Sequence, residues 1–188
     1  IWKSGWYPSD SQGRFVRPPT TFRGQLEATS DRYHLYAALA CPWAHRLLVA
    51  RSLLGLENDI GLTVVHWELT DDGWAFLEPQ IEPVPAHFLR DVYLAADSNY
   101  SGRVTVPICW DLQEKTIVNN ESRELLRQFC SHLGPQLNPA APDLSPEPLR
   151  AQIDAMLDRI YLVNNGVYQA GFAKTQEAYD EAVEKLFL

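Results

Sequence analysis

The chain has 188 residues, of which 46% are apolar, enough for a packed core and too many for an intrinsically disordered chain. Its formal net charge of −8 argues against a nucleic-acid partner, because phosphate backbones are bound by clustered Lys and Arg. No apolar run approaches the roughly 20 residues that span a bilayer, and no signal-peptide pattern opens the sequence, so no membrane partner is expected. The three cysteines are widely spaced and form no CxxC pair, which favours a reducing compartment such as the cytoplasm.

In chain order, the sequence begins with an aromatic and polar stretch, residues 1–30, that we expect to form an extended arm. Residues 32–39 alternate between apolar and polar side chains and predict a strand. Cys41 and Pro42 then open a helix, since Pro is favoured at the first helical position. β-Branched residues predict the next strand over 62–68.

The middle of the chain combines an irregular stretch with a second group of elements. Residues 69–102 read as a long connection with one short helix over 87–96, and connections of this length are more often functional than filler. Residues 104–111 and 116–119 predict two antiparallel strands joined by a turn. Residues 121–133 predict an amphipathic helix.

Five prolines between residues 134 and 148 indicate a linker, and helical patterns follow over 149–163 and 175–188. This order of elements predicts an α/β protein, with a thioredoxin-like domain followed by the beginning of an all-α domain. The predicted parts are an extended arm (1–30), the thioredoxin-like domain (31–134), a Pro-rich linker (135–148) and the incomplete all-α domain (149–188).

Cys41 is the main candidate nucleophile. At a helix start, unpaired N–H groups and the positive end of the helix dipole favour a thiolate, and His45 and Arg46 can add positive potential. The alternative is a buried structural cysteine, which is how we interpret Cys109 and Cys130. No metal site is predicted, because Cys41 and His45 lack two further ligands at a matching spacing. Without a CxxC pair, a mixed disulfide on Cys41 must be released by a small thiol such as glutathione.

Two further segments suit a peptide-like ligand. Pro107 in a strand requires an edge, a bulge or a cis bond, and a cis bond would leave the Val106 backbone free to pair with an extended ligand. An ordinary edge proline is the alternative. Glu121 and Ser122 open the next helix, where N–H groups and the hydroxyl suit a carboxylate and the Glu121 carboxylate suits an ammonium. A plain helix cap is the alternative there.

With these features placed, six motifs in order resemble the glutathionyl-hydroquinone reductases, the Xi class of glutathione transferases. The motifs are CPWAHR (41–46), DGWAF (72–76), GRVTVP (102–107), NNES (119–122), NNGVY (164–168) and AGFA (170–173). The resemblance extends over essentially the whole chain and implies a thioredoxin-like domain followed by the beginning of an all-α glutathione-transferase C-terminal domain. It also implies a homodimer, and further C-terminal tyrosines at positions that would follow Leu188.

The resemblance implies that glutathionyl-hydroquinones are reduced with glutathione to hydroquinones. Cys41 would attack the glutathionyl sulfur, and Tyr168, with Tyr161 as the rival, would serve as proton donor or acceptor for the leaving ring. A second glutathione, the co-substrate, would release the mixed disulfide as glutathione disulfide. The implied partners are glutathione and glutathionyl-quinones, with no metal. The implied glutathione contacts are Trp74, Arg103, Val104, Thr105, Val106, Pro107, Glu121 and Ser122.

Two other functions stay open on the residues alone. One is a general monothiol glutathione transferase that removes glutathione from proteins or reduces dehydroascorbate. Good turnover of a mixed disulfide without turnover of a glutathionyl-hydroquinone would indicate it. The other is a non-catalytic thioredoxin-like binding module, for which Cys41 would alkylate no faster than free cysteine.

Overall fold

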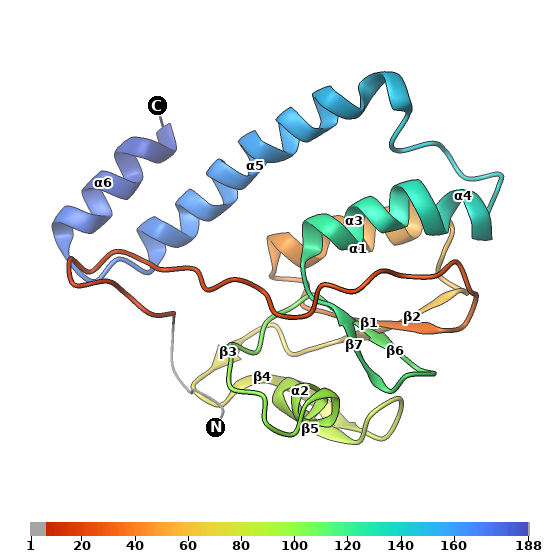
Figure 1. The fold of residues 1–188 in the computed structure, drawn as a ribbon. Coiled ribbons are helices and arrows are strands. Elements are labelled where there is room, and N and C mark those ends of the chain that lie inside the picture. The colour runs from red at the N-terminus through yellow and green to blue at the C-terminus, as the bar shows by residue number, and fades with distance from the viewer. Residues whose placement is uncertain (1–6, 188) are drawn as a thin grey trace. The chain divides into compact units, whose positions relative to one another are not determined.

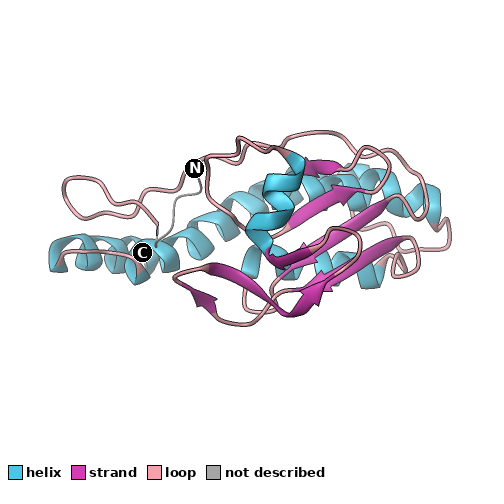
Figure 2. Ribbon diagram, turned by 90° about the horizontal axis from the view of Figure 1, so that it is seen from below, coloured by secondary structure: helices cyan, strands magenta, loops and turns pink. Residues whose placement is uncertain are grey.

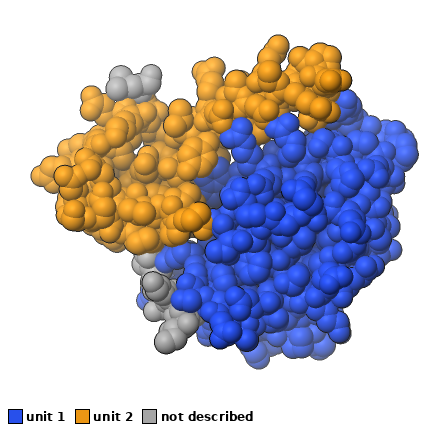
Figure 3. All heavy atoms as spheres, in the orientation of Figure 1, with its two compact units in different colours: residues 1–4, 20–144 blue, residues 5–19, 145–188 orange. Residues whose placement is uncertain are grey.

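A four-stranded sheet forms the centre of one of the two units into which the described residues, 7–187, divide (Figure 3). We call residues 20–144 the sheet unit, and residues 7–19 together with 145–187 the helical unit. Residues 7–30 of the predicted arm occur in both units, and residues 1–6 lie outside the described residues. Within residues 7–187, no helix is both long and apolar enough to cross a membrane.

The sheet has the strand order β2-β1-β6-β7, and it has the predicted thioredoxin-like form. The first strand, β1 (Tyr33–Ala37), pairs in parallel with β2 (Ile60–Val64), and α1 (Pro42–Leu53) supplies the crossover that parallel pairing requires. β6 (Ile108–Asp111) pairs antiparallel with β1, and β7 (Thr116–Asn119) pairs antiparallel with β6. The predicted antiparallel strand pair is therefore confirmed.

The bounds of two strands, β2 and β6, differ from their predicted ranges. β2 begins before the predicted range 62–68 and ends inside it, because its partner β1 ends at Ala37. The Val65 N–H still donates to the Ala37 carbonyl at 2.9 Å, but the His66 N–H donates to the Ala75 carbonyl at 2.8 Å. β6 begins only after Pro107, because proline has no N–H to give to the sheet. Residues 104–107 precede the strand as an irregular loop.

The prediction of an irregular stretch over residues 69–102 is wrong. Three strands, β3 (Leu69–Thr70), β4 (Gly73–Gln80) and β5 (Ala86–Phe88), form a second antiparallel sheet (Figure 2). Gly73 has φ +92°, a conformation that glycine adopts at little cost, and it closes the turn between β3 and β4. The sheet is held by burial of apolar side chains, which the local sequence pattern does not reveal.

The short helix predicted inside this stretch is confirmed as α2 (Leu89–Ala96). The Asp91 carboxylate accepts hydrogen bonds from the backbone N–H groups of His87 and Phe88, both at 2.9 Å, and so closes the helix start. Its buried face carries Leu89, Val92 and Tyr93. This face packs into the same apolar cluster as the second sheet.

Helices cover both faces of the central sheet (Figure 1). α1 and α3 (Ser122–Gln128) pack together on one face, and α2 lies on the other with the second sheet. The predicted helix 121–133 is confirmed, and it continues through a π-helical turn, Phe129–Leu133, into α4 (Gly134–Leu137). A 3-10 turn, Glu147–Leu149, precedes the helices of the helical unit.

The helical unit is built on α5 (Arg150–Gly171) and α6 (Gln176–Phe187). Both predicted helices are confirmed, but α5 continues well past residue 163; Leu188 lies outside the described residues. Gly166 explains the extension, since it is buried where a Cβ would stand 3.0 Å from the Leu186 side chain. Close packing of the two helices thus outweighs the low helix propensity of the Asn-Asn-Gly segment.

Candidate active site

Cys41 stands at the junction of β1 and α1, as the residue that caps the N-terminus of α1. Its backbone is extended, with φ −95° and ψ 116°, and its carbonyl accepts the first helical hydrogen bond from the His45 N–H at 2.9 Å. The side chain is 7% exposed, and Sγ lies 3.6 Å from the Val106 carbonyl oxygen. A thiol is therefore held beside the N–H groups of a helix start, where the dipole favours a thiolate.

The other two cysteines are buried like Cys41, but neither lies at the start of a helix. Cys109 lies in β6 and is completely buried, and burial raises the pKa of its thiol. Burial also raises the pKa of the Cys130 thiol. Both side chains thus fit the structural interpretation, because an inert thiol is what apolar burial produces.

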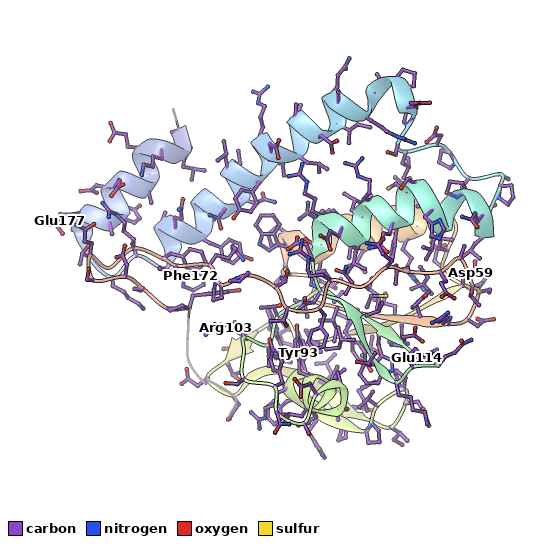
Figure 4. All side chains as sticks on the ribbon, in the orientation of Figure 1. Asp59, Tyr93, Arg103, Glu114, Phe172 and Glu177 are labelled. Atoms are coloured by element: carbon purple, nitrogen blue, oxygen red, sulfur yellow. The ribbon has the colours of Figure 1, made fainter. Side chains whose placement is uncertain are left out.

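The loop of residues 103–107 is fixed by two tyrosine hydroxyls. Tyr93 on α2 donates to the Thr105 carbonyl oxygen at 3.0 Å and accepts from the Thr105 N–H at 3.3 Å (Figure 4 labels Tyr93 and Arg103). Tyr100 donates to the Arg103 carbonyl oxygen at 2.6 Å. The peptide bond between Val106 and the next residue is cis. This loop holds the carbonyl that faces the Cys41 sulfur.

Sequence reasoning did not find Tyr93 or Tyr100. Tyr93 also accepts a hydrogen bond from the Asn120 side chain at 3.2 Å, so it joins the loop to the start of α3. Burial raises the pKa of Tyr100 to about 12, so its hydroxyl stays a donor. The available signal was a tyrosine on the apolar face of a predicted helix, since a buried hydroxyl needs a partner.

The start of α3 brings the predicted Glu121 and Ser122 next to α1. Glu121 caps the helix by accepting from the Arg123 N–H at 3.2 Å. Ser122 is buried, and its hydroxyl accepts from the Arg46 guanidinium at 2.5 Å. Burial lowers the pKa of Arg46, and the nearby carboxylate of Glu121 opposes this. The guanidinium carbon of Arg46 also stands 5.1 Å from the centre of the Trp43 ring on the same helix. Through its bond to Ser122, Arg46 thus connects α1 with the start of α3.

Trp74 reaches the same region from the second sheet. It lies at the start of β4, opposite Leu69 of β3. Its side chain packs, half-buried, against the apolar cluster that contains Cys41 and Val106, and Val104 does the same. The sheet unit therefore holds Cys41, Trp74, Val104 and Val106 in or against one apolar cluster, and it holds Glu121 and Ser122 at the start of α3.

Tyr168 lies in the helical unit, so the structure defines its surroundings but does not bring it together with Cys41. It sits near the end of α5 in a cluster with Tyr7, Phe15 and Phe172, at ring-centre distances of 6.2, 6.2 and 5.8 Å. The rival Tyr161 is 44% exposed. Tyr168 is half-buried among the rings of this cluster.

No metal-binding cluster of three or more His, Cys, Asp or Glu side chains occurs in the part of the chain that the structure describes.

The chain is similar to several known proteins. Residues 40–132 match the family model of the glutathione S-transferase N-terminal domain. A glutathionyl-hydroquinone reductase of Sphingobium chlorophenolicum is 46% identical over 198 residues, which cover 100% of this chain and 63% of that protein. The crystal structure of the glutathione-S-transferase Xi from Phanerochaete chrysosporium has a TM-score of 0.85 at 42% identity, covering 96% of this chain and 62% of that one.

A glutathione transferase homologue from Escherichia coli K-12, solved with glutathione bound, has a TM-score of 0.78 at 44% identity, covering 95% of this chain and 58% of that one. The chain thus spans less than two thirds of the length of these relatives. The identities are high, and the matches extend over both units of the chain. Over nearly its whole length the chain is similar to glutathionyl-hydroquinone reductases and to glutathione transferases of the Xi class, and residues 40–132 match the glutathione S-transferase N-terminal domain.

Proposed function

We propose that this protein reduces glutathionyl-hydroquinones to hydroquinones with glutathione, and that Cys41 is the nucleophile. The observation that carries the proposal is the position of Cys41 at the start of α1, where the positive end of the helix dipole favours a thiolate. All three cysteines are buried, but Cys41 is the one at a helix start, since Cys109 lies within β6 and Cys130 lies within the π-helical turn after α3. Relatives named for this activity support the choice of substrate.

The proposed reaction has two displacement steps. The Cys41 thiolate attacks the sulfur that joins glutathione to the ring, a sulfur–sulfur bond forms and the sulfur–carbon bond breaks. The ring carbon keeps the electron pair and takes up a proton, so the ring leaves as the hydroquinone while the two sulfurs are oxidised to a disulfide. A second glutathione thiolate then attacks the glutathionyl sulfur, which forms glutathione disulfide and restores the Cys41 thiolate.

Glutathione would bind along the sheet unit as an extended peptide. The Val106 backbone would pair with the cysteinyl part, in the manner of strand addition. The start of α3, with Ser122 and the Glu121 carboxylate, would hold the γ-glutamyl head group, since N–H groups suit its carboxylate and Glu121 suits its ammonium. Trp74 and Arg103 would hold the glycyl end, because an indole N–H and a guanidinium are both donors.

The remaining predicted contacts and partners complete the proposal. Val104, Thr105 and Pro107 would shape the loop around the cysteinyl part. Tyr168 would exchange a proton with the leaving ring, because a phenol can both donate and accept. We further propose that the protein acts as a homodimer in the cytoplasm, without a metal.

The test is intact-mass spectrometry of the protein after incubation with reduced glutathionyl-menadione and no free glutathione. The expected result is one added glutathione per chain and one released menadiol. Cys41→Ser should show neither, whereas Cys130→Ala, which removes another of the buried thiols, should keep both. A folded protein that forms no adduct contradicts the proposal. Turnover of a mixed disulfide alone would point instead to a general thioltransferase.

A further inference from the structure

An arginine of the arm, Arg17, reaches into the aromatic cluster around Tyr168, and the proposed reaction gives it no task. Its guanidinium carbon stands 4.7 Å from the centre of the Tyr168 ring, which is the shortest of its ring distances within this cluster. The distances to the rings of Phe15 and Tyr7 are 5.2 and 5.7 Å. Separations under about 6 Å allow cation–π attraction.

A hydrogen bond fixes the same guanidinium from another direction. Its Nε donates to the Asn165 side-chain oxygen at 2.7 Å. Asn165 and Tyr168 are three residues apart on α5, so they lie on neighbouring positions of one helix face. Arg17 thus connects two positions of this face, and the hydrogen bond sets where its charge stands relative to the Tyr168 ring.

The arm itself is fixed at several points of the helical unit, so the position of Arg17 is determined by the fold. Ser9 and Phe15 form an antiparallel bridge across a tight turn. The carbonyl of Gly13 accepts from the Lys174 N–H at 2.9 Å, and the Thr175 hydroxyl donates to the Gln12 carbonyl at 3.0 Å. The arm is therefore tied to the turn that connects α5 and α6.

The other charged side chains that link the arm and α6 are engaged with one another. Arg14 pairs with Glu181 at 2.8 Å, and Asp10 lies 4.0 Å from Arg14. Lys185 pairs with the same Glu181 at 2.5 Å. Arg14 thus offers a comparison within the arm, because its guanidinium pairs with the carboxylate of Glu181 on α6.

We propose that Arg17 is a positioning residue for Tyr168, which it holds in one orientation by the contact with the ring face and the hydrogen bond to Asn165. The expected effect of Arg17 on kcat rests on the proposed role of Tyr168 in proton exchange. The expected effect of Arg17 on the orientation of the Tyr168 ring does not depend on that role. Arg17 would then set the rate of the ring-releasing step without contacting glutathione.

The experiment compares Arg17→Ala, Arg17→Lys, Arg14→Ala and Tyr168→Phe in the full-length protein. Arg17→Ala should lower kcat about tenfold, the size of a partly buried cation–π contact, with little change in the KM for glutathione. Arg17→Lys, which keeps the charge, should recover part of this loss, and Arg14→Ala should stay within about twofold of the unchanged protein. Equal losses in Arg17→Ala and Arg14→Ala would overturn the proposal.

A readout independent of activity separates this inference from the proposed function. In protein labelled with 13C at tyrosine Cζ, the signal of Tyr168, identified by its absence in Tyr168→Phe, should move in Arg17→Ala and stay in Arg14→Ala. An unmoved signal in Arg17→Ala would overturn the inference. Full activity of Tyr168→Phe together with a moved signal would remove the catalytic role of Tyr168 and leave Arg17 as the residue that positions its ring.

Discussion

The surroundings of Cys41 and of Tyr168 are built in opposite ways. Around Cys41, a strand-to-helix junction fixes the residue locally, and buried hydrogen bonds from Tyr93 and Tyr100 fix the facing loop. Around Tyr168, the fixing groups come from an arm that precedes it by about 150 residues, and they act through ring contacts and one cation. The first arrangement leaves a signature in the local sequence, and the second leaves almost none.

The two regions also differ in how the loss of one side chain destabilises them. A buried hydroxyl that holds two backbone groups cannot be removed without leaving those groups unsatisfied. A cluster of rings loses contact area when one is removed, but no polar group is left stranded. Substitutions can therefore disturb the two regions separately.

The largest expected effect is on the helical unit. Phe15→Ala removes a ring that is 7% exposed and contacts Tyr7, Tyr168 and Phe172, which should cost about 3–5 kcal/mol of local stability. Hydrogen exchange should show lost protection in residues 7–19, α5 and α6, with β1 unchanged. Val16→Ala, which alters an exposed neighbour, is the matched control. Equal loss of protection in β1 would show that the two regions are not separable.

A smaller effect is expected from the loop that faces Cys41. Tyr93→Phe removes the hydroxyl that serves the N–H and carbonyl of Thr105 and the Asn120 side chain, so it should lower the free energy of unfolding by about 2–3 kcal/mol. Tyr100→Phe, which removes the donor to the Arg103 carbonyl, should cost about 1 kcal/mol. Urea denaturation followed by circular dichroism measures both. If Tyr100→Phe lowered the free energy of unfolding more than Tyr93→Phe does, the prediction that the Tyr93 hydroxyl contributes more would be wrong.

The smallest effect is a pH dependence of stability that comes from His34 in the sheet unit. Burial, and then Arg51, lower the pKa of His34 to about 4, so the folded protein resists a proton that the unfolded chain accepts near pH 6.5. The resulting stability is complete above pH 6.5 and is lost as the pH falls toward 4. With a discount for partial exposure, this amounts to about 1 kcal/mol between pH 7.5 and pH 5.

The measurement is the difference between His34→Gln and the unchanged protein in urea denaturation at these two pH values. The variant should lose less stability on acidification, because its amide does not titrate, while it can still bond to the Thr63 hydroxyl, which lies 2.7 Å from the His34 ring nitrogen. Identical pH dependence of the two proteins would show that burial does not act on His34 as described.

The elements that sequence predicts well are those with local causes. β1, α1 and β7 follow from alternation, from the Cys41-Pro42 start and from β-branched residues, and the structure has each near its predicted range. The second sheet was missed because its strands are short and its order depends on packing against α2 rather than on a regular alternation. The end of α5 was missed because Gly166 packs on Leu186 of another helix, a contact that no local window contains.

The residues of the candidate site also differ in whether the local sequence is enough to identify them. Cys41 could be found from sequence because a cysteine before proline at a helix start has a direct chemical meaning. Tyr93 could not be assigned its partners, since the hydrogen bond that matters joins α2 to a loop outside it. Tyr168 by itself would count as a packing residue, and its neighbour Arg17 lies in a stretch without periodicity.

The arm has a consequence for the order in which the protein is made. Residues 7–19 are synthesised before the sheet unit, but their partners in α5 and α6 are synthesised only after it. Because domains fold as units during synthesis, the sheet unit can form while the rings of Tyr7 and Phe15 still await Tyr168 and Phe172. The aromatic side chains of residues 7–19 thus reach their packed positions only after α5 and α6 have been synthesised.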